Sequence, residues 1–216
     1  TWTETSSSVI LCLTNDVNVD DDVLLTIAEG TIIKADYGQL SVHGTLDVNG
    51  SETNPVVFTS IEDDTWGGDT NNDADATVPA PGNWNGIYLN GSNDNEGIGY
   101  FDHCRIRYGG YTGGTADANL YFYNSVDGYF KNSFSEYSYD DGLRAEYVDI
   151  AIENSSFENN DKYAADMSYI TIQNYPGNSA SGNGVDAFGV QGKVDSDITW
   201  TETSSSVILC LTNDVN

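Results

Sequence analysis

Short stretches in which apolar and polar residues alternate recur along the whole chain, separated by glycine, asparagine and aspartate. Such alternation predicts β-strands with one buried face, and no stretch of about 10–15 residues with a helical period lies between them. The pattern therefore predicts an all-β protein, either a sandwich or a solenoid. The stretches are VILCLT, VLLTIA, TIIKA, LSVHGTLDV, PVVFTS, NGIYL, YFDHCRIRY, NLYFY, GYFKNSF, VDIAIENSSF, YITIQN and GVDAFGV.

A regular spacing of asparagines favours the solenoid. Asn132, Asn154 and Asn174 each follow an alternating apolar stretch, and they are nearly evenly spaced along the chain. One coil of a β-solenoid has about this length. An asparagine at the same bend of successive coils can satisfy backbone groups and stack its amide on the next asparagine. Turn residues of any other β-protein are the alternative interpretation.

The segment TWTETSSSVILCLTNDVN, which opens the chain, recurs without a change as residues 199–216. Identity over this length indicates a recent tandem duplication, an engineered copy or a segment of a longer array. We expect residues 1–198 to form one repeat unit, with Thr1 a cut through a structural unit, and residues 199–216 to be the first strand region of the next. Residues 207–211 should pack on the preceding coils.

The repeat also determines how the cysteines are counted. Because Cys210 is the copy of Cys12, each unit holds two cysteines, Cys12 and Cys104, and the odd total of three does not indicate a reactive thiol. Both alternate with residues of the opposite strand face, so we expect buried, free thiols that point inward. A disulfide within or between units is the alternative.

Charge and composition restrict the partners. The 216 residues contain 34 acidic and 7 basic side chains, for a net charge of −27. Nucleic-acid binding is excluded because it depends on clustered basic side chains, and binding to anionic membranes is disfavoured. No run of about 20 apolar residues predicts membrane insertion, and no signal segment opens the chain. With 38% hydrophobic residues and 14 tyrosines, we expect one soluble, folded domain.

Several motifs of the chain resemble those of one protein family. The specific part covers residues 23–60, then Trp84 and the bend Arg107-Tyr108-Gly109-Gly110, and the likeness extends from Thr1-Trp2-Thr3 through nearly the whole unit. These residues resemble the right-handed parallel β-helix repeat proteins found among secreted and cell-surface proteins of bacteria. The later stretches are generic for the fold.

The resemblance implies a right-handed, three-sided parallel β-helix and an extracellular or cell-surface location. It does not imply one activity, because this fold carries adhesins, polysaccharide lyases, hydrolases and passive stalks. At about 22 residues per coil, we expect about nine coils per unit, interrupted by an acidic loop. Coils stacked at about 4.8 Å would give each unit a length of roughly 40 Å.

The acidic loop, at about residues 62–83, contains a candidate calcium site. Four of its oxygen-bearing side chains occupy alternate positions, a spacing that lets them surround one hard cation, and two more precede them. The six candidate ligands are Asp69, Asn71, Asp73 and Asp75, with Asp63 and Asp64. A solvated acidic loop is the alternative.

The spacing of these residues resembles the first half of an EF-hand loop. An EF-hand is nevertheless rejected, because Ala74 stands where that loop needs glycine and Ala80 where it needs the bidentate glutamate. The glycine-rich calcium repeat GGxGxD is also absent. Two other acidic runs, residues 20–22 and Asp140-Asp141, are interpreted as solvated turns.

The chemistry of an enzyme is not evident in the sequence. His103 and Cys104 are neighbours on a predicted strand and should point to opposite faces, so His103 is badly placed to activate the thiol. His43 stands alone, and no serine elbow motif is present. A polysaccharide lyase or glycoside hydrolase could use carboxylates from stacked coils, but no pair is singled out. We expect no catalytic residue.

Aromatic residues leave a glycan-binding function open. Trp66 and Trp84 flank the acidic loop, and Tyr108 and Tyr111 lie at the bend that follows. Such rings can stack on sugars, although packing in the core or anchoring of the loop is the alternative role for each. Three sequons, at Asn49, Asn90 and Asn154, permit glycosylation.

The sequence thus predicts an extracellular structural protein, a fibre, filament or stalk of tandem β-solenoid units stabilised by calcium. Its main partner would be itself, end to end along the solenoid axis, either as covalent units or as a homopolymer. An adhesin or carbohydrate-binding module, with glycans as partners, is the first alternative. A polysaccharide lyase or glycoside hydrolase is the second.

Overall fold

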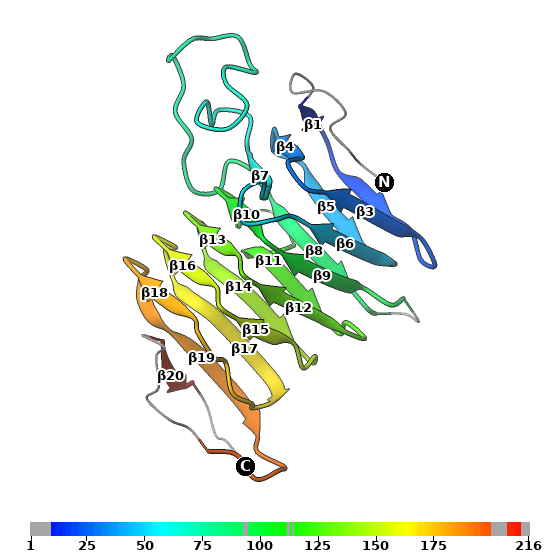
Figure 1. Cartoon of the computed structure of the whole chain (residues 1–216), viewed down its shortest axis with the longest axis vertical. Helices are drawn as coiled ribbons and strands as arrows, with labels where there is room; N and C mark the ends of the chain where they lie inside the picture. The colour runs from blue at the N-terminus through cyan, green and yellow to red at the C-terminus, as the bar shows by residue number, and fades with distance from the viewer. Residues whose placement is uncertain (1–9, 93–94, 112, 114, 200–206, 213–216) are drawn as a thin grey trace.

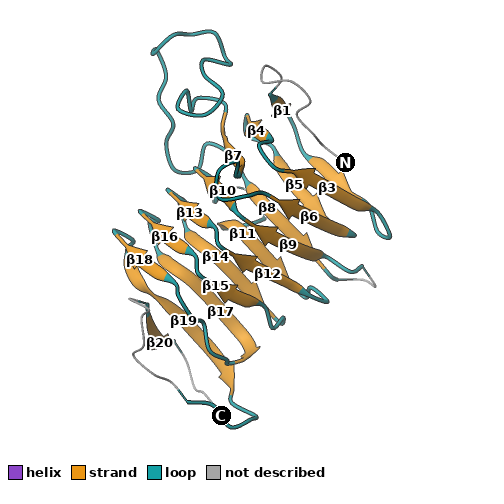
Figure 2. Ribbon diagram, viewed as in Figure 1, coloured by secondary structure: helices purple, strands orange, loops and turns teal. Residues whose placement is uncertain are grey.

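The protein is an all-β structure of stacked parallel strands. The computed structural model describes residues 10–92, 95–111, 113, 115–199 and 207–212. These residues form 20 strands in three sheets, and none of them is helical (Figure 2). β1 and β20 lie at opposite ends of the stack (Figure 1).

Each sheet takes its strands from the whole length of the chain. Sheet 1 consists of β1 (Leu11–Leu13), β4 (Ile32–Ala35), β7 (Val56–Ser60), β10 (Cys104–Arg107), β13 (Phe134–Glu136), β16 (Ser156–Glu158) and β18 (Ser179–Ser181). Sheet 2 consists of β2 (Val17–Val19), β5 (Gln39–Val42), β8 (Gly86–Asn90), β11 (Ala118–Tyr123), β14 (Asp141–Glu146), β17 (Tyr163–Thr171), β19 (Val185–Lys193) and β20 (Ile208–Leu211). Sheet 3 consists of β3 (Leu24–Ala28), β6 (Thr45–Asn49), β9 (Ile98–Asp102), β12 (Gly128–Lys131) and β15 (Ala151–Glu153).

The chain visits the three sheets in rotation, and we call one passage a round. β1, β2 and β3 lie in sheets 1, 2 and 3, β4 returns to sheet 1, and the order repeats as far as β15. Every strand pair is parallel. In the last rounds β17 bends at a register shift, where Tyr169 has a φ of 58°. The predictions of an all-β fold and of parallel strands are confirmed.

The number of rounds is smaller than predicted. Sheet 2 holds seven strands that precede the copied segment, β2 to β19, so the described part of the unit has seven rounds instead of about nine. The prediction assigned the whole unit to coils of constant length. In the structure, residues 61–85 lie between β7 and β8, residues 108–111 and 115–117 lie between β10 and β11, and these connections lengthen two of the rounds.

Equivalent residues of successive rounds form inward columns that make the core. The column in sheet 2 contains Leu40, Ile87, Leu120, Leu143, Ala165, Phe188 and Leu209, which are register partners in that order. Sheet 3 adds Phe101 and Phe130, whose ring centroids are 6.4 Å apart. Burial of each large apolar side chain contributes about 1.5–3 kcal/mol, so these columns supply much of the cohesion between rounds.

Asparagine marks two successive corners between sheets 3 and 1, as predicted. Asn132 and Asn154 follow β12 and β15, and both have a φ of 50°, a left-handed conformation that asparagine tolerates. The prediction for Asn174 is wrong, because Gly177, with a φ of 71°, takes the next corner. An added Cβ at Gly177 would overlap Asn154 Oδ1, so the close approach of the two rounds requires glycine there.

The copied segment lies in a different sheet from its original. β20 has the sequence of residues 10–13, yet β1 pairs with β4 in sheet 1, whereas β20 pairs with β19 in sheet 2. Cys12 is the register partner of Lys34, and its copy Cys210 is the partner of Gly189. The segment therefore packs on the preceding strands, as predicted, but one sheet further round than the original segment.

The three cysteines are free thiols in different surroundings. Cys104 is buried, and this burial raises the pKa of its thiol to about 12. The expectation that Cys12 points inward is wrong, because Leu11 and Leu13 face the core and the residue between them is exposed. Cys210 is partly exposed. The disulfide alternative is not realised among them.

Candidate functional site

The acidic loop leaves the sheets between β7 and β8 and projects beyond them (Figure 1). Its first anchor is Asp63, whose side chain is fully buried. Asp63 Oδ2 accepts a hydrogen bond from Thr59 Oγ1 at 2.5 Å and lies 2.9 Å from Arg107 Nη1. Its other oxygen accepts the backbone N–H of Thr65 at 3.1 Å. These contacts occupy Asp63, so the structure does not bring it to the predicted calcium ligands.

A buried lysine forms the second anchor. Lys34 on β4 has no exposed surface, and its Nζ donates to the carbonyl oxygen of Gly68 at 2.6 Å. Its removal from water lowers the pKa of Lys34, although the nearby Asp64 and Asp63 act in the opposite direction. The loop thus covers the outer face of sheet 1 around β4 and β7, and for this reason β7 is buried on both faces.

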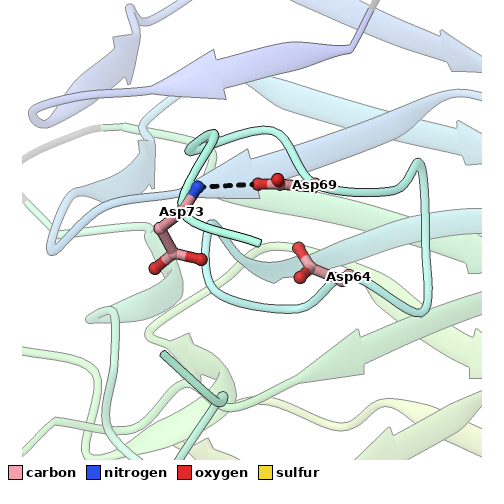
Figure 3. Close-up of side chains that lie close together, drawn as sticks. All are labelled: Asp64, Asp69 and Asp73. Carbon is pink, nitrogen blue, oxygen red and sulfur yellow. Dashed lines mark hydrogen bonds between the residues drawn. The ribbon is translucent and has the colours of Figure 1, made fainter. Parts of the chain in front are cut away.

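Three of the predicted ligands come together inside the loop. Asp64, Asp69 and Asp73 each offer a carboxylate oxygen, and these oxygens lie within 4.8 Å of one another. Figure 3 shows the three carboxylates around one space. Asp69 holds the turn, because its two oxygens accept the N–H groups of Asp73 at 3.1 Å and Ala74 at 3.0 Å. Ala74 has a φ of 56°, the conformation for which an EF-hand uses glycine.

Oxygens of this group are shielded from solvent without a hydrogen-bond partner. They are the Oδ1 atoms of Asp64, Asn71 and Asp73. The amide of Asn71 is held by its nitrogen, which donates to Asp73 Oδ2 at 3.0 Å and to Thr77 Oγ1 at 3.1 Å. Buried acceptors without a partner are costly, and a hard cation satisfies several of them at once. Asn71 therefore belongs with the three aspartates, whereas Asp75 is exposed.

The electrostatics of the group agree with a cation site. Loss of hydration raises the pKa of Asp64, and the charge of Asp69 raises it further. Lys34 acts in the opposite direction but donates its hydrogen bond to a backbone carbonyl. A divalent cation would reduce the repulsion between these carboxylates and would coordinate the oxygens that receive no hydrogen bond from the protein.

The four aromatic residues singled out by the sequence differ in their exposure to solvent. Trp84 is 1% exposed and its Nε1–H donates to the carbonyl oxygen of Arg107 at 2.7 Å. Tyr108 is also buried, so both act in packing. Trp66 lines a pocket of about 320 Å³, and Tyr111 is exposed.

A groove that sequence reasoning missed lies beside the turn that follows β14 and the bend of β17 at Tyr169. We call it the tyrosine groove; it has a volume of about 660 Å³, and its lining includes Ser125, Tyr147, Asp149, Tyr169, Thr171 and Lys193. The exposed rings of Tyr147 and Tyr169 stack with centroids 4.4 Å apart. Ser125 is 6% exposed, and its buried hydroxyl has no hydrogen-bond partner. The spacing of the two tyrosines by one coil length was the available sequence signal.

The histidine and cysteine pair is not a nucleophilic site. His103 Nδ1 lies 2.7 Å from Asp102 Oδ1, and His103 occupies a corner with a φ of 50°. Cys104 is buried in the core, and the high pKa of its thiol leaves almost none of the reactive thiolate at neutral pH. The expectation that these neighbours do not cooperate in catalysis is in line with this geometry.

A second acidic cluster is buried rather than solvated. Asp140 and Asp141 are each 4% exposed, so the interpretation as a solvated turn is wrong. Asp141 begins β14 and its Oδ1 accepts the N–H of Tyr163 on the neighbouring strand at 3.0 Å. Lys162 Nζ lies 2.6 Å from Asp140 Oδ2. Burial, and then the charges of Asp140 and Asp166, raise the pKa of Asp141 to about 7.

Asp141→Asn should stabilise the protein above pH 7. The pKa of Asp141 is about 7 in the folded protein and ordinarily 3.8, so only the folded protein keeps this proton between these values. Stability therefore falls as pH rises from about 4 to 7 and stays lower above that range. The full pKa difference would correspond to roughly 4 kcal/mol, of which we expect about 1–2 kcal/mol, because the surroundings of a buried charge relax and admit water.

Urea unfolding of wild type and of Asp141→Asn at pH 5 and pH 8 measures this effect. The variant should be more stable than wild type at pH 8, and its stability should change less between the two pH values. Asp161→Asn, in an exposed turn of the same region, is the charge-matched control. An equal pH dependence for all three proteins would contradict the assignment.

Comparisons with protein-family models, with curated proteins and with solved structures found no match to the chain. Among the residues that the structure describes, no helix is long and apolar enough to span a membrane. Function is therefore argued from three features of the structure, which are the acidic loop, the tyrosine groove and the copied segment.

Proposed function

We propose that the protein is a structural rod unit, a right-handed three-sided β-solenoid repeated in tandem in an extracellular fibre, filament or stalk. The observation that supports this most directly is the pairing of β20 on β19. The first strand of the copied segment thereby adds the next strand to sheet 2, instead of starting a separate domain. Strand edges at the end of such a stack have unpaired backbone groups, which a following unit would satisfy.

The charge of the protein suits a rod in an extracellular or cell-surface setting. A net charge of −27 would keep neighbouring rods soluble and apart unless cations bridge them. The role we propose is assembly and not turnover, and the pairing of β20 on β19 is the observation that supports it. Self-association along the axis, as covalent units or as a homopolymer, is the proposed partnership.

Electron microscopy of chains with one, two and four units tests this function. Seven rounds at about 4.8 Å predict that each added unit lengthens a straight rod by about 35 Å. Each chain would be extended by further copies of residues 19–216, so that the copied segment is present once at every junction. Units that appear as separate beads on flexible linkers, with no common axis, would overturn the proposal.

We further propose that Asp64, Asp69, Asp73 and Asn71 hold a calcium ion. The proposal is supported by their unpartnered oxygens and by the absence of a neighbouring basic group that donates to the carboxylates among the described residues. Carboxylate and amide oxygens are the ligands that calcium prefers. The ion would stiffen the acidic loop against sheet 1 and thereby strengthen the rod.

Carbohydrate binding in the tyrosine groove is the second candidate function. The unpartnered hydroxyl of Ser125 supports it, because a sugar hydroxyl could supply the missing hydrogen bond beside two exposed rings. Neutral or cationic glycans are favoured over acidic ones by the negative charge of the protein. Function as an adhesin would follow if such a ligand were anchored on another surface.

Tyr169→Ala should weaken glycan binding if the groove has this function. Wild type would first be screened on a glycan array, and the affinity of any bound sugar would be measured by calorimetry. Loss of a stacking ring should reduce that affinity at least about tenfold. Tyr37→Ala is a matched control, because Tyr37 is also exposed at a corner, with a φ of 61° beside 58° for Tyr169. Equal effects of both variants, or no bound sugar, would contradict the proposal.

A further inference from the structure

The copied segment shows how one unit meets the next. In the first unit this segment forms β1, which pairs with β4 in sheet 1. In the second copy it forms β20, which pairs with β19 in sheet 2. Because a parallel strand inside a sheet has two neighbours, one segment at a junction can make both pairings at once.

We infer that successive units are rotated by one sheet about the rod axis, so that sheet 2 of one unit continues as sheet 1 of the next. The inference rests on the proposed tandem rod. At the junction the strand would have β19 of the preceding unit on one side and the equivalent of β4 on the other. Its cysteine would lie between Gly189 and the copy of Lys34, the partners that Cys210 and Cys12 have in the two pairings.

The register of the chain supports this continuity. Along sheet 2, Ala165, Phe188 and Leu209 are successive register partners. In sheet 1, Leu11 and Ile33 are register partners in the same way. Each of these steps covers about 22 residues of chain, the length of one ordinary solenoid coil. The step onto the copied segment and the step away from it are therefore both ordinary rounds, and no insertion or deletion is needed at the junction.

The unit then contains seven rounds and one third of another. A single acidic loop leaves each unit, so the loops would follow a helical path around the rod and return to the same side after three units. At about 4.8 Å per round, this corresponds to a rise of about 35 Å per unit and an axial repeat of about 105 Å. The partner that each unit fits is thus a second copy turned by one third of a revolution.

Disulfide trapping tests the position of the copied segment in the full chain. In a Cys12→Ser background, Gly189→Cys should form a disulfide with Cys210, because these positions are register partners. Ser181→Cys, on β18 in sheet 1, is the control for an unrotated junction, because Ser181 has the register position in that sheet that Cys12 has on β1, and it should stay reduced. Mass spectrometry under non-reducing conditions measures both. A disulfide from Ser181→Cys alone would overturn the inference.

A second pair of cysteine substitutions tests the same pairing of β20 with β19 in case Gly189→Cys disturbs the fold. An added Cβ at Gly189 would lie 2.8 Å from Asp166 Oδ1, so that variant has to shift its neighbour. Ala187 and Ile208 are also register partners, and Ile208 is exposed. Ala187→Cys with Ile208→Cys, in a chain in which Cys12 and Cys210 are serine, should therefore also be trapped. Absence of both disulfides in folded protein would likewise overturn the inference.

Electron microscopy of four-unit chains tests the rotation itself. We expect acidic loops to project in three directions, with an axial repeat of about 105 Å. A straight rod with all loops on one side and a repeat of about 35 Å would overturn the rotation but leave the proposed rod intact. Separate beads without a common axis would instead overturn the proposed function, so the two failures are distinguishable.

Discussion

Replacing Arg107 with methionine should lower the free energy of unfolding by about 3–5 kcal/mol. Arg107 Nη1 lies 2.9 Å from Asp63 Oδ2, and the side chain of Asp63 is fully buried. Methionine keeps most of the apolar contact but leaves the Asp63 carboxylate without its positive partner. The remaining bonds from Thr59 and Thr65 are too weak to offset an unpaired buried charge.

Arg105→Met is the matched control for this prediction. Arg105 lies on the same strand and pairs with Glu136 at 2.8 Å, but its side chain is 28% exposed, and we expect a loss of about 1 kcal/mol or less. Urea unfolding measures both variants. Equal losses of stability would contradict the prediction that the buried Asp63 pair matters more to stability than the more exposed Arg105 pair. The double variant Asp63→Asn with Arg107→Met should recover part of the stability, because no buried charge is then left unpaired.

Calcium should raise the melting temperature of the protein by about 5–10 °C. A ligand present at one hundred times its dissociation constant stabilises the folded state by about 2.7 kcal/mol, and each kcal/mol corresponds to about 2–4 °C for a chain of this size. The effect requires the shielded oxygens of Asp64, Asn71 and Asp73. Asp73→Asn should therefore weaken calcium binding at least about tenfold and remove most of the rise.

Two controls separate this site from general screening of charge. Asp21→Asn removes one carboxylate from an exposed turn far from the loop in sequence and should leave the calcium effect unchanged. The sequence spacing includes Asp75 among the calcium ligands, whereas the structure leaves Asp75 exposed. If the geometry is right, Asp75→Asn should leave the calcium effect unchanged. Calorimetry and thermal unfolding in calcium, magnesium and sodium chloride measure the effect. Identical curves for Asp73→Asn and Asp21→Asn would contradict the site.

Local patterns predicted the strands well because their cause is local. Alternation of apolar residues determines which side chains point inward, and it identified the strands that now form the columns around Leu120 and Phe130. The asparagine spacing located two corners, at Asn132 and Asn154, but not the third. Near Asn174 the chain instead uses Gly177, because the corner there lies against the side chain of Asn154.

Contacts between side chains of different rounds could not be predicted from the sequence. Asp63 and Asp64 are adjacent, yet one pairs with Arg107, 44 residues away, and the other joins the aspartates of the loop. Asp141 looked solvated because the sequence does not show the neighbouring strand, whose Tyr163 N–H it accepts. The copied segment itself was evident at once, but its placement beside Gly189 depends on the lengths of all the preceding rounds.

The anchors of the acidic loop also determine how the molecule would respond to a pulling force. Lys34 on β4, Asp63 after β7 and Arg107 on β10 connect three consecutive strands of sheet 1 through one loop. Rounds outside this block are held mainly by ladders and core contacts between adjacent strands, so under tension they should peel from the ends one at a time. Each would release roughly 75 Å of extended chain. The clamped block should yield last, as a single larger event, so the loop would act as a mechanical clamp.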